Sequence, residues 1–308
     1  MSRKASFILV IVGYLLAIFI GGIGYLLLGT AIETENKLLE IIIKCAFMDV
    51  IATIIVYIFA LFLKNTSYYD PYWSVWPPII ILFPMIMESN LWSITSILIL
   101  IVVLIYAFRL TFNWAIRFKG FKPEEEDYRY RKYRNTLHPA LFELVNFFGL
   151  IMMPTVLVFF GSIPLLYGVY YGNTFNPLYI IGLAIALSGV LIEIFSDLAL
   201  IKWKKDPSNK GKLLKIGLWK YSRHPNYLGE VTVWVGFGVL GLTVCLINNI
   251  PNEIWINVLG AILIFLLFNT ISVKLMDDRM KTRYIEYQDY MKQTSRFFIL
   301  PRRNINEK

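Results

Sequence analysis

Eight long stretches of apolar residues follow one another along this chain of 308 residues. They fall at 6–29, 38–63, 74–88, 90–112, 142–170, 177–202, 227–247 and 254–275. A helix needs about 20 apolar residues to cross the roughly 30 Å hydrocarbon core of a bilayer, where the backbone must satisfy its own hydrogen bonds. The pattern therefore predicts an all-α fold, a polytopic transmembrane helical bundle of about 7–8 spans that forms a single integral-membrane domain.

Two of these stretches carry prolines in their interior. The stretch 74–88 is short and holds three prolines, so we expect it to be broken or only partly inserted. The stretch 142–170 holds Pro154 and Pro164 and is long enough for a kinked or tilted helix. The number of complete spans therefore depends on the third stretch.

Basic residues gather in some connecting segments and avoid others. The segments 113–140 and 203–226 each contain seven Lys or Arg, and the tail from residue 277 contains eight. The segments 171–176 and 248–253 contain none. By the positive-inside rule, the basic segments and both termini are expected to face the cytoplasm, at the plasma membrane of a bacterium or the endoplasmic reticulum of a eukaryote.

The net charge of +9 has the same explanation. The basic residues orient helices and meet lipid or ligand phosphates, so no nucleic-acid partner is expected. Cys45 and Cys245 both fall in apolar stretches and are interpreted as small core residues. No His/Cys cluster has metal-ligand spacing, and the sequence predicts no metal site.

Ionisable residues inside membrane spans are expensive, and each is a candidate for a functional site. The second and sixth apolar stretches contain such candidates, namely Lys44, Asp49, Glu193, Asp197 and Lys202. Glu193 and Asp197 are four residues apart and share a helical face that leads into the basic segment 203–226. In an alternative interpretation, Asp197 pairs with Lys202 or Arg223 and only holds two helices together.

The segment 217–230 has the highest density of functional side chains. Its second half reads Arg-His-Pro-Asn-Tyr-Leu-Gly-Glu and begins at Arg223, where a basic segment enters the seventh stretch. Arg223 can bind a phosphate or carboxylate through two parallel hydrogen bonds. His224 titrates near neutral pH, and Asn226 offers both a donor and an acceptor. The alternative is an anchor at the membrane interface, with aromatic rings at headgroup level and a snorkelling arginine.

These residues carry a resemblance to a known family. Residues 182–238, with the Asp-Pro-Ser-Asn-Lys-Gly loop at 206–211 and the turn at 223–230, resemble the steroid 5-alpha-reductase-like membrane family, in particular its DUF1295 branch. The resemblance extends to 65–75 (Asn-Thr-Ser-Tyr-Tyr-Asp-Pro-Tyr-Trp-Ser-Val) and to 287–301. It therefore covers most of the chain.

The resemblance implies an NADPH-dependent reductase of an activated C=C bond in a lipophilic substrate such as a steroid, an isoprenoid or an enone lipid. It places the cofactor against the last spans, so residues 141–308 would bind the cofactor and residues 1–140 would form the substrate side. The cofactor-binding candidates are Glu193, Asp197, Lys204, Arg223, His224, Asn226, Tyr227 and Glu230. Steroid reductases carry Asn at position 193 and Arg at position 204. They also use an Arg and a Tyr on the last helix, for which only Lys274, Asp278, Arg279 and Tyr284 lie nearby.

Hydride transfer to an enone leaves an enolate oxygen, which needs a hydrogen-bond donor or acid. In steroid reductases a Glu and a Tyr from early spans hold the substrate carbonyl, and this sequence has no clear equivalent of that pair. The catalytic candidates are Asp49, Tyr69, Asp70 and Tyr72, with Tyr57 as a further phenol. The turn that begins at Asp70 is equally compatible with a helix cap and an aromatic belt.

Two other functions are compatible with the sequence. Isoprenylcysteine and phospholipid methyltransferases also carry an Arg-His-Pro-x-Tyr turn, which binds S-adenosylmethionine and precedes a paired acidic motif. Asp277 and Asp278 resemble that pair, whereas Asn226 and the stretch 197–215 favour the reductase. A non-catalytic lipid-binding or transporter-like bundle would distribute polar residues across the membrane, but here they gather on one side. The expected partners are a lipophilic small molecule and membrane lipid, with the oligomeric state open.

Overall fold

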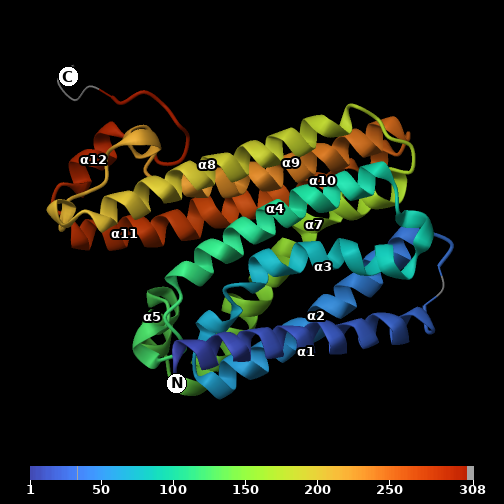
Figure 1. Ribbon diagram of the computed structural model, residues 1–308, viewed down its shortest axis with the longest axis horizontal. Helices are drawn as coiled ribbons and strands as arrows, with labels where there is room; N and C mark the ends of the chain where they lie inside the picture. Colours follow the sequence, from blue (N-terminus) through green and yellow to red (C-terminus); the bar gives the residue numbers. More distant parts are fainter. Residues whose placement is uncertain (33, 304–308) are drawn as a thin grey trace.

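A computed structural model of the chain describes residues 1–32 and 34–303, and the regular elements within these ranges are all helices (Figure 1). The longer helices are α1 (Arg3–Gly29), α2 (Lys37–Leu63), α3 (Tyr72–Met87), α4 (Ile94–Arg117), α7 (Met153–Tyr171), α8 (Tyr179–Lys205), α9 (Pro225–Ile247), α10 (Ile254–Leu267) and α11 (Val273–Arg283). The short helices are α5 (Tyr128–Thr136), α6 (Pro139–Val145) and α12 (Tyr287–Gln293). Single turns include η1 (Thr66–Tyr69) and two π-helical turns, η4 (Asn146–Met152) and η8 (Phe268–Ser272).

Within residues 1–32 and 34–303, seven helical segments are long and apolar enough to cross a bilayer. They are α1, α2, α4, the continuous segment Pro139–Tyr171, α8, α9 and the continuous segment Pro251–Arg283. The prediction of a polytopic helical bundle is confirmed.

The third apolar stretch forms α3, which has 16 residues and is therefore ~24 Å long. The helix is continuous through its prolines, so the expected break is absent, whereas partial insertion stays a prediction. Pro84 cannot donate to the carbonyl of Ile80, and the thiol of Cys45 donates to that carbonyl instead (3.6 Å).

Successive helices run back and forth along the bundle (Figure 1). The N-terminus, α5 and α12 lie at one end, and the ion pair between Lys215 and Glu286 places the segment 203–226 beside α12 at that end. We call it the basic end. The predicted grouping of the basic segments is therefore present, and their cytoplasmic location stays a prediction.

Two helices change to a wider π-helical turn in mid-course. The turn η4 joins α6 to α7 just before Pro154, close to the kink expected from the sequence. The turn η8 joins α10 to α11. Single π-helical turns inside α-helices are rare and frequently mark functional sites.

The helices α8 and α9 touch backbone to backbone. Gly182 and Gly189 of α8 face Gly236 and Gly229 of α9. A Cβ atom on Gly236 would lie 2.4 Å from the backbone nitrogen of Ala186, too close for any larger residue. Small residues let membrane helices approach in this way. The contact fixes the side chains of α8 relative to those of α9.

Gly236→Ala is expected to destabilise the protein by about 1–3 kcal/mol, because the added methyl group must push α9 away from α8. Thermal unfolding of the purified protein in detergent measures the change. Gly149→Ala is the matched control, since its Cβ would lie 3.8 Å from the nearest heavy atom in the described residues. Equal melting temperatures for the two variants would contradict the close α8–α9 contact.

Candidate active site

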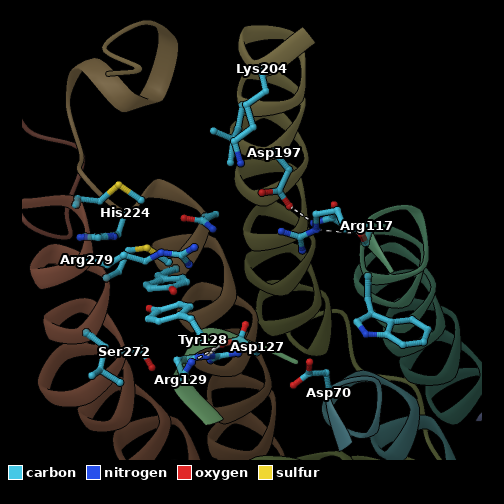
Figure 2. Close-up of a pocket in the computed structure, with 18 of the residues that line it drawn as sticks. Asp70, Arg117, Asp127, Tyr128, Arg129, Asp197, Lys204, His224, Ser272 and Arg279 are labelled. Carbon is cyan, nitrogen blue, oxygen red and sulfur yellow. Dashed lines mark hydrogen bonds and ion pairs between the residues drawn. The ribbon is translucent and has the colours of Figure 1, made fainter. Parts of the chain in front are cut away.

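A cavity of about 1140 Å³ lies at the basic end, between α4, α8, α9 and α11 and the segments that connect them. Small-molecule pockets usually hold about 300–1,000 Å³, so this one has room for a cofactor and a substrate together. Figure 2 shows labelled side chains from these elements around the space, including Asp197 and Lys204 on α8 and Arg279 on α11.

All of the predicted cofactor-binding residues line this cavity, namely Glu193, Asp197, Lys204, Arg223, His224, Asn226, Tyr227 and Glu230. Two of the catalytic candidates, Tyr69 and Asp70, also line it. The other two, Asp49 and Tyr72, are buried behind its wall. Arg279 and Tyr284 contribute to the lining from α11 and its C-cap, whereas Lys274 and Asp278 do not.

Arg109 of α4 is the centre of a buried ion-pair network. Its Nη1 pairs with Glu193 Oε2 and its Nη2 with Asp197 Oδ2, and the Asn113 amide also donates to Asp197. The alternative pairing of Asp197 with Lys202 or Arg223 is therefore wrong. A guanidinium on a helix opposite α8 reaches both carboxylates at once, whereas Lys202 lies on the same helix. Sequence reasoning missed Arg109, although a lone arginine within the stretch 90–112 was a usable signal.

The carboxyl group of Glu230 joins three helices. Its Oε1 accepts hydrogen bonds from Trp73 Nε1 (2.7 Å), Tyr106 OH (2.7 Å) and Trp234 Nε1 (2.9 Å). The Glu230 and Glu193 carboxyl groups also lie close enough to interact. Glu230 is 4% exposed, so these contacts fix it at the innermost wall of the cavity.

The turn that precedes α9 holds a second buried cluster around Asp277 of α11. Asp277 Oδ1 contacts His224 Nε2 (2.8 Å) and accepts from Tyr287 OH (2.5 Å), and Arg223 Nη2 lies 3.4 Å from Oδ2. Burial lowers the pKa of His224, although Asp277 opposes the shift, so the ring is neutral and donates from Nε2. The Nε and Nη1 atoms of Arg223 are buried without a hydrogen-bond partner among residues 1–32 and 34–303.

Seven basic side chains of the cavity have no ion-pair partner within the ranges that the structure describes, and four of them lie near one another. These four are Arg117, Lys204, Arg279 and Arg283, and the other three are Lys205, Lys210 and Lys212. The Lys204 ammonium lies within electrostatic range of the three guanidinium groups, and Arg279 stacks over the Tyr128 ring at 4.0 Å. Such a group of uncompensated cations creates a positive potential that favours a ligand with several negative charges.

Tyr69 ends a chain of hydrogen bonds that runs from the cavity wall into the protein. Its hydroxyl contacts Thr155 (2.9 Å), which contacts Thr53 (3.2 Å). Thr53 bonds to the Tyr72 hydroxyl (3.1 Å), which in turn donates to Asp49 Oδ1 (2.6 Å). Asp49 is 1% exposed, and its Oδ2 has no hydrogen-bond partner in the described ranges. Burial raises the pKa of Tyr69, so its hydroxyl keeps its proton at neutral pH.

Asp70 faces the segment that contains α5. Its Oδ1 accepts a hydrogen bond from Tyr130 OH (2.8 Å). Burial raises the pKa of Asp70 to about 7, although the Arg129 guanidinium opposes the shift. Asp70 therefore changes charge near neutral pH.

The arrangement defines a helical membrane protein with a cation-rich cavity at one end of its bundle. Residues 56–294 match the family model described as "Protein of unknown function (DUF1295)". The match covers more than half of the chain, which therefore belongs to the DUF1295 family. The family resemblance predicted from the sequence is confirmed.

Known relatives connect this family to steroid reductases. An uncharacterized protein of Schizosaccharomyces pombe is 24% identical over 76% of this chain and 73% of its own length. Human 3-oxo-5-alpha-steroid 4-dehydrogenase 1 is 33% identical, and the Arabidopsis thaliana steroid 5-alpha-reductase DET2 is 32% identical, each over 22% of this chain. These two matches span 27% and 26% of the respective relatives. No solved structure matches the chain.

Arg109→Gln is expected to destabilise the protein by about 3–5 kcal/mol, because it leaves Glu193 and Asp197 buried without their cation. Thermal or chemical unfolding in detergent measures the loss. Arg117→Gln is the matched control, since it removes an arginine from the end of the same helix that forms no ion pair in the described ranges. A similar loss for both variants would show that the network contributes little.

Proposed function

We propose that this protein is an NADPH-dependent reductase of an activated C=C bond in a lipophilic substrate. The observation that carries the proposal is the group of uncompensated cations in the cavity, Arg117, Lys204, Arg279 and Arg283. A dinucleotide with a pyrophosphate and a 2′-phosphate carries several negative charges, which would neutralise these cations. The local similarity to named steroid reductases supports the same class of reaction.

The residues present fit such a cofactor. The four cations of this group would hold its phosphates, and the unpartnered Nε and Nη1 of Arg223 would donate to a further oxygen. The Arg109 network keeps Glu193 and Asp197 in place on the α8 wall, and Asn226 offers an amide at the turn. Bound NADPH would supply a hydride, which is the chemistry that the side chains of this protein lack.

Tyr69 is the proposed acid of the reaction. Addition of a hydride to the β-carbon of an enone breaks the C=C π bond and moves its electron pair onto the carbonyl oxygen. Tyr69 stabilises that oxygen by donating a hydrogen bond, and its proton passes to the enolate. The hydrogen-bonded chain through Thr155, Thr53 and Tyr72 to Asp49 orients the Tyr69 hydroxyl, and the tyrosinate left by the step would regain its proton from solvent.

Two different regions of the chain are thus proposed to hold the hydride donor and the proton donor. Residues 141–308 contribute most of the cationic side of the cavity and are proposed to bind the cofactor, with Arg117 added from α4. Residues 1–140 contribute Tyr69 and Asp70 and are proposed as the substrate side. The basic end is proposed to face the cytoplasm, where NADPH is available.

The two acidic residues that a methyltransferase would use, Asp277 and Asp278, do not lie in the cavity. Asp277 is occupied by His224, Tyr287 and Arg223, whereas Asp278 pairs on the surface with Lys281. Neither carboxylate lines the cavity. S-Adenosylmethionine also carries a sulfonium cation, which surplus positive charge disfavours.

Titration of the purified protein with NADPH and with S-adenosylmethionine is expected to show binding of NADPH alone.

Arg223→Ala is expected to raise the NADPH dissociation constant at least about tenfold, roughly 1.4 kcal/mol, because it removes buried donors. Lys204→Gln removes one of the four cations and leaves the contacts of Asp277 in place, so a raised NADPH dissociation constant in this variant reports on the cation group. Lys220→Ala is the matched control, a cation of the same segment outside the cavity. Tight binding of S-adenosylmethionine without NADPH binding would refute the proposed function.

Tyr69→Phe is expected to lower the rate of NADPH oxidation with a long-chain enone by about 100-fold, the usual size of a lost general acid. The rate of the unmodified protein should stay level as the pH rises through 7, because Tyr69 keeps its proton there. A rate that instead falls above pH 7, together with loss of activity in Asp70→Asn, would make Asp70 the acid, since its pKa is raised to about 7. Tyr68→Phe is the control, a neighbouring buried phenol bonded to the Leu9 carbonyl.

A further inference from the structure

The helices α7 and α10 pack closely through glycines, and the segments that contain them separate toward the basic end (Figure 1). A Cβ atom on Gly260 of α10 would lie 2.3 Å from the backbone nitrogen of Gly161 on α7, so the two backbones touch there. From this contact the green α6–α7 segment and the orange α10–α11 segment diverge toward the basic end (Figure 1). Each segment contains its π-helical turn on the diverging side, η4 in one and η8 in the other.

Both π-helical turns reach the cavity and give it an apolar wall. Gly149 and Leu150 line it from η4, and Phe268, Ile271 and Ser272 line it from η8, with Ser272 labelled in Figure 2. The adjoining residues of α7 and α10 that also line it are Met153, Pro154 and Leu267. This wall carries no charged side chain, in contrast to the cation-rich wall of α8 and α11.

The same apolar wall is exposed on the side of the bundle. Ile271 lines the cavity, yet 47% of its surface is exposed. Phe148, next to Gly149, is 61% exposed. Both turns belong to segments that are long and apolar enough to cross a bilayer, so their exposed apolar side chains are suited to contact with lipid. The cavity thus has an apolar edge facing the lipid.

We propose that the gap between η4 and η8 is a lateral portal, through which a long apolar chain passes between the cavity and the bilayer. The ligand is an amphiphile, a lipid with a compact reactive head and a long hydrocarbon or isoprenoid tail. Its tail lies between Leu150, Phe268 and Ile271 and extends into the lipid phase. The identity of the reactive head as an enone rests on the proposed function, but the binding of the tail does not.

Gly149 provides a way to close the portal. Outside the local backbone of its own helix, a Cβ atom there would meet its nearest atom, Val145 Cγ1, at 3.8 Å, so Gly149→Phe can add a side chain at the opening. Val156→Phe is the matched control. Val156 lies two turns further along the same segment, is 41% exposed and does not line the cavity.

The test uses the full chain in phosphatidylcholine vesicles and a long-chain enone with a diazirine at the end of its tail. After irradiation, mass spectrometry is expected to locate the label in 148–154 and 267–275. An excess of the same enone without the diazirine should suppress it. Gly149→Phe should reduce this labelling about tenfold, whereas Val156→Phe should leave it unchanged. Phosphatidylcholine with a diazirine at the end of its acyl chain should instead label the whole lateral surface without competition.

Label concentrated elsewhere on the protein, or label that excess enone does not suppress, would overturn the portal. Equal labelling of Gly149→Phe and the unmodified protein would do the same. NADPH binding is measured in the same vesicles, because it reports on the proposed function independently. Competed portal labelling without NADPH binding would retain the portal and refute the reductase. NADPH binding with labelling at another place would do the reverse.

Discussion

One guanidinium holds the centre of this molecule together. Arg109 is the shared partner of Glu193 and Asp197, and the position of Glu193 beside Glu230 extends the network to α3 and α9. Charges in a membrane interior are stable only when they are paired. The pairing therefore determines how α4 lies against α8, and the glycine contacts determine how α8 lies against α9. The inner wall of the cavity follows from these two constraints.

The two sides of the cavity are built by different physical means. Beside α8 and α9, helices touch backbone to backbone and side chains are held by ion pairs, which gives a rigid wall suited to a ligand of fixed shape. Beside α7 and α10, the helices pack through glycines, and the π-helical turns η4 and η8 line the cavity mainly with apolar side chains. A rigid polar wall and a largely apolar wall together fit the proposed cofactor and the proposed lipid substrate.

The fold and the cofactor-side lining could be predicted because their signals are local. Apolar stretches determine the spans, and the turn that begins at Arg223 carries its polar residues in one short segment. Arg109 could have been identified as the lone charged residue of its apolar stretch, but its partners Glu193 and Asp197 become visible only when α4 meets α8. The route from Tyr69 to Asp49 passes through Thr53 and Thr155, which lie 102 residues apart and have no distinguishing sequence pattern.

The uncompensated cations also have a consequence for the protein before it binds any ligand. Arg117, Lys204, Arg279 and Arg283 repel one another while no anion lies between them, so the cavity then carries electrostatic strain. Some of the affinity for any polyanion is then relief of that repulsion and not new contact. Small buffer anions would accumulate there when no larger ligand competes, and the ionic strength of the surroundings would set how much of the repulsion remains.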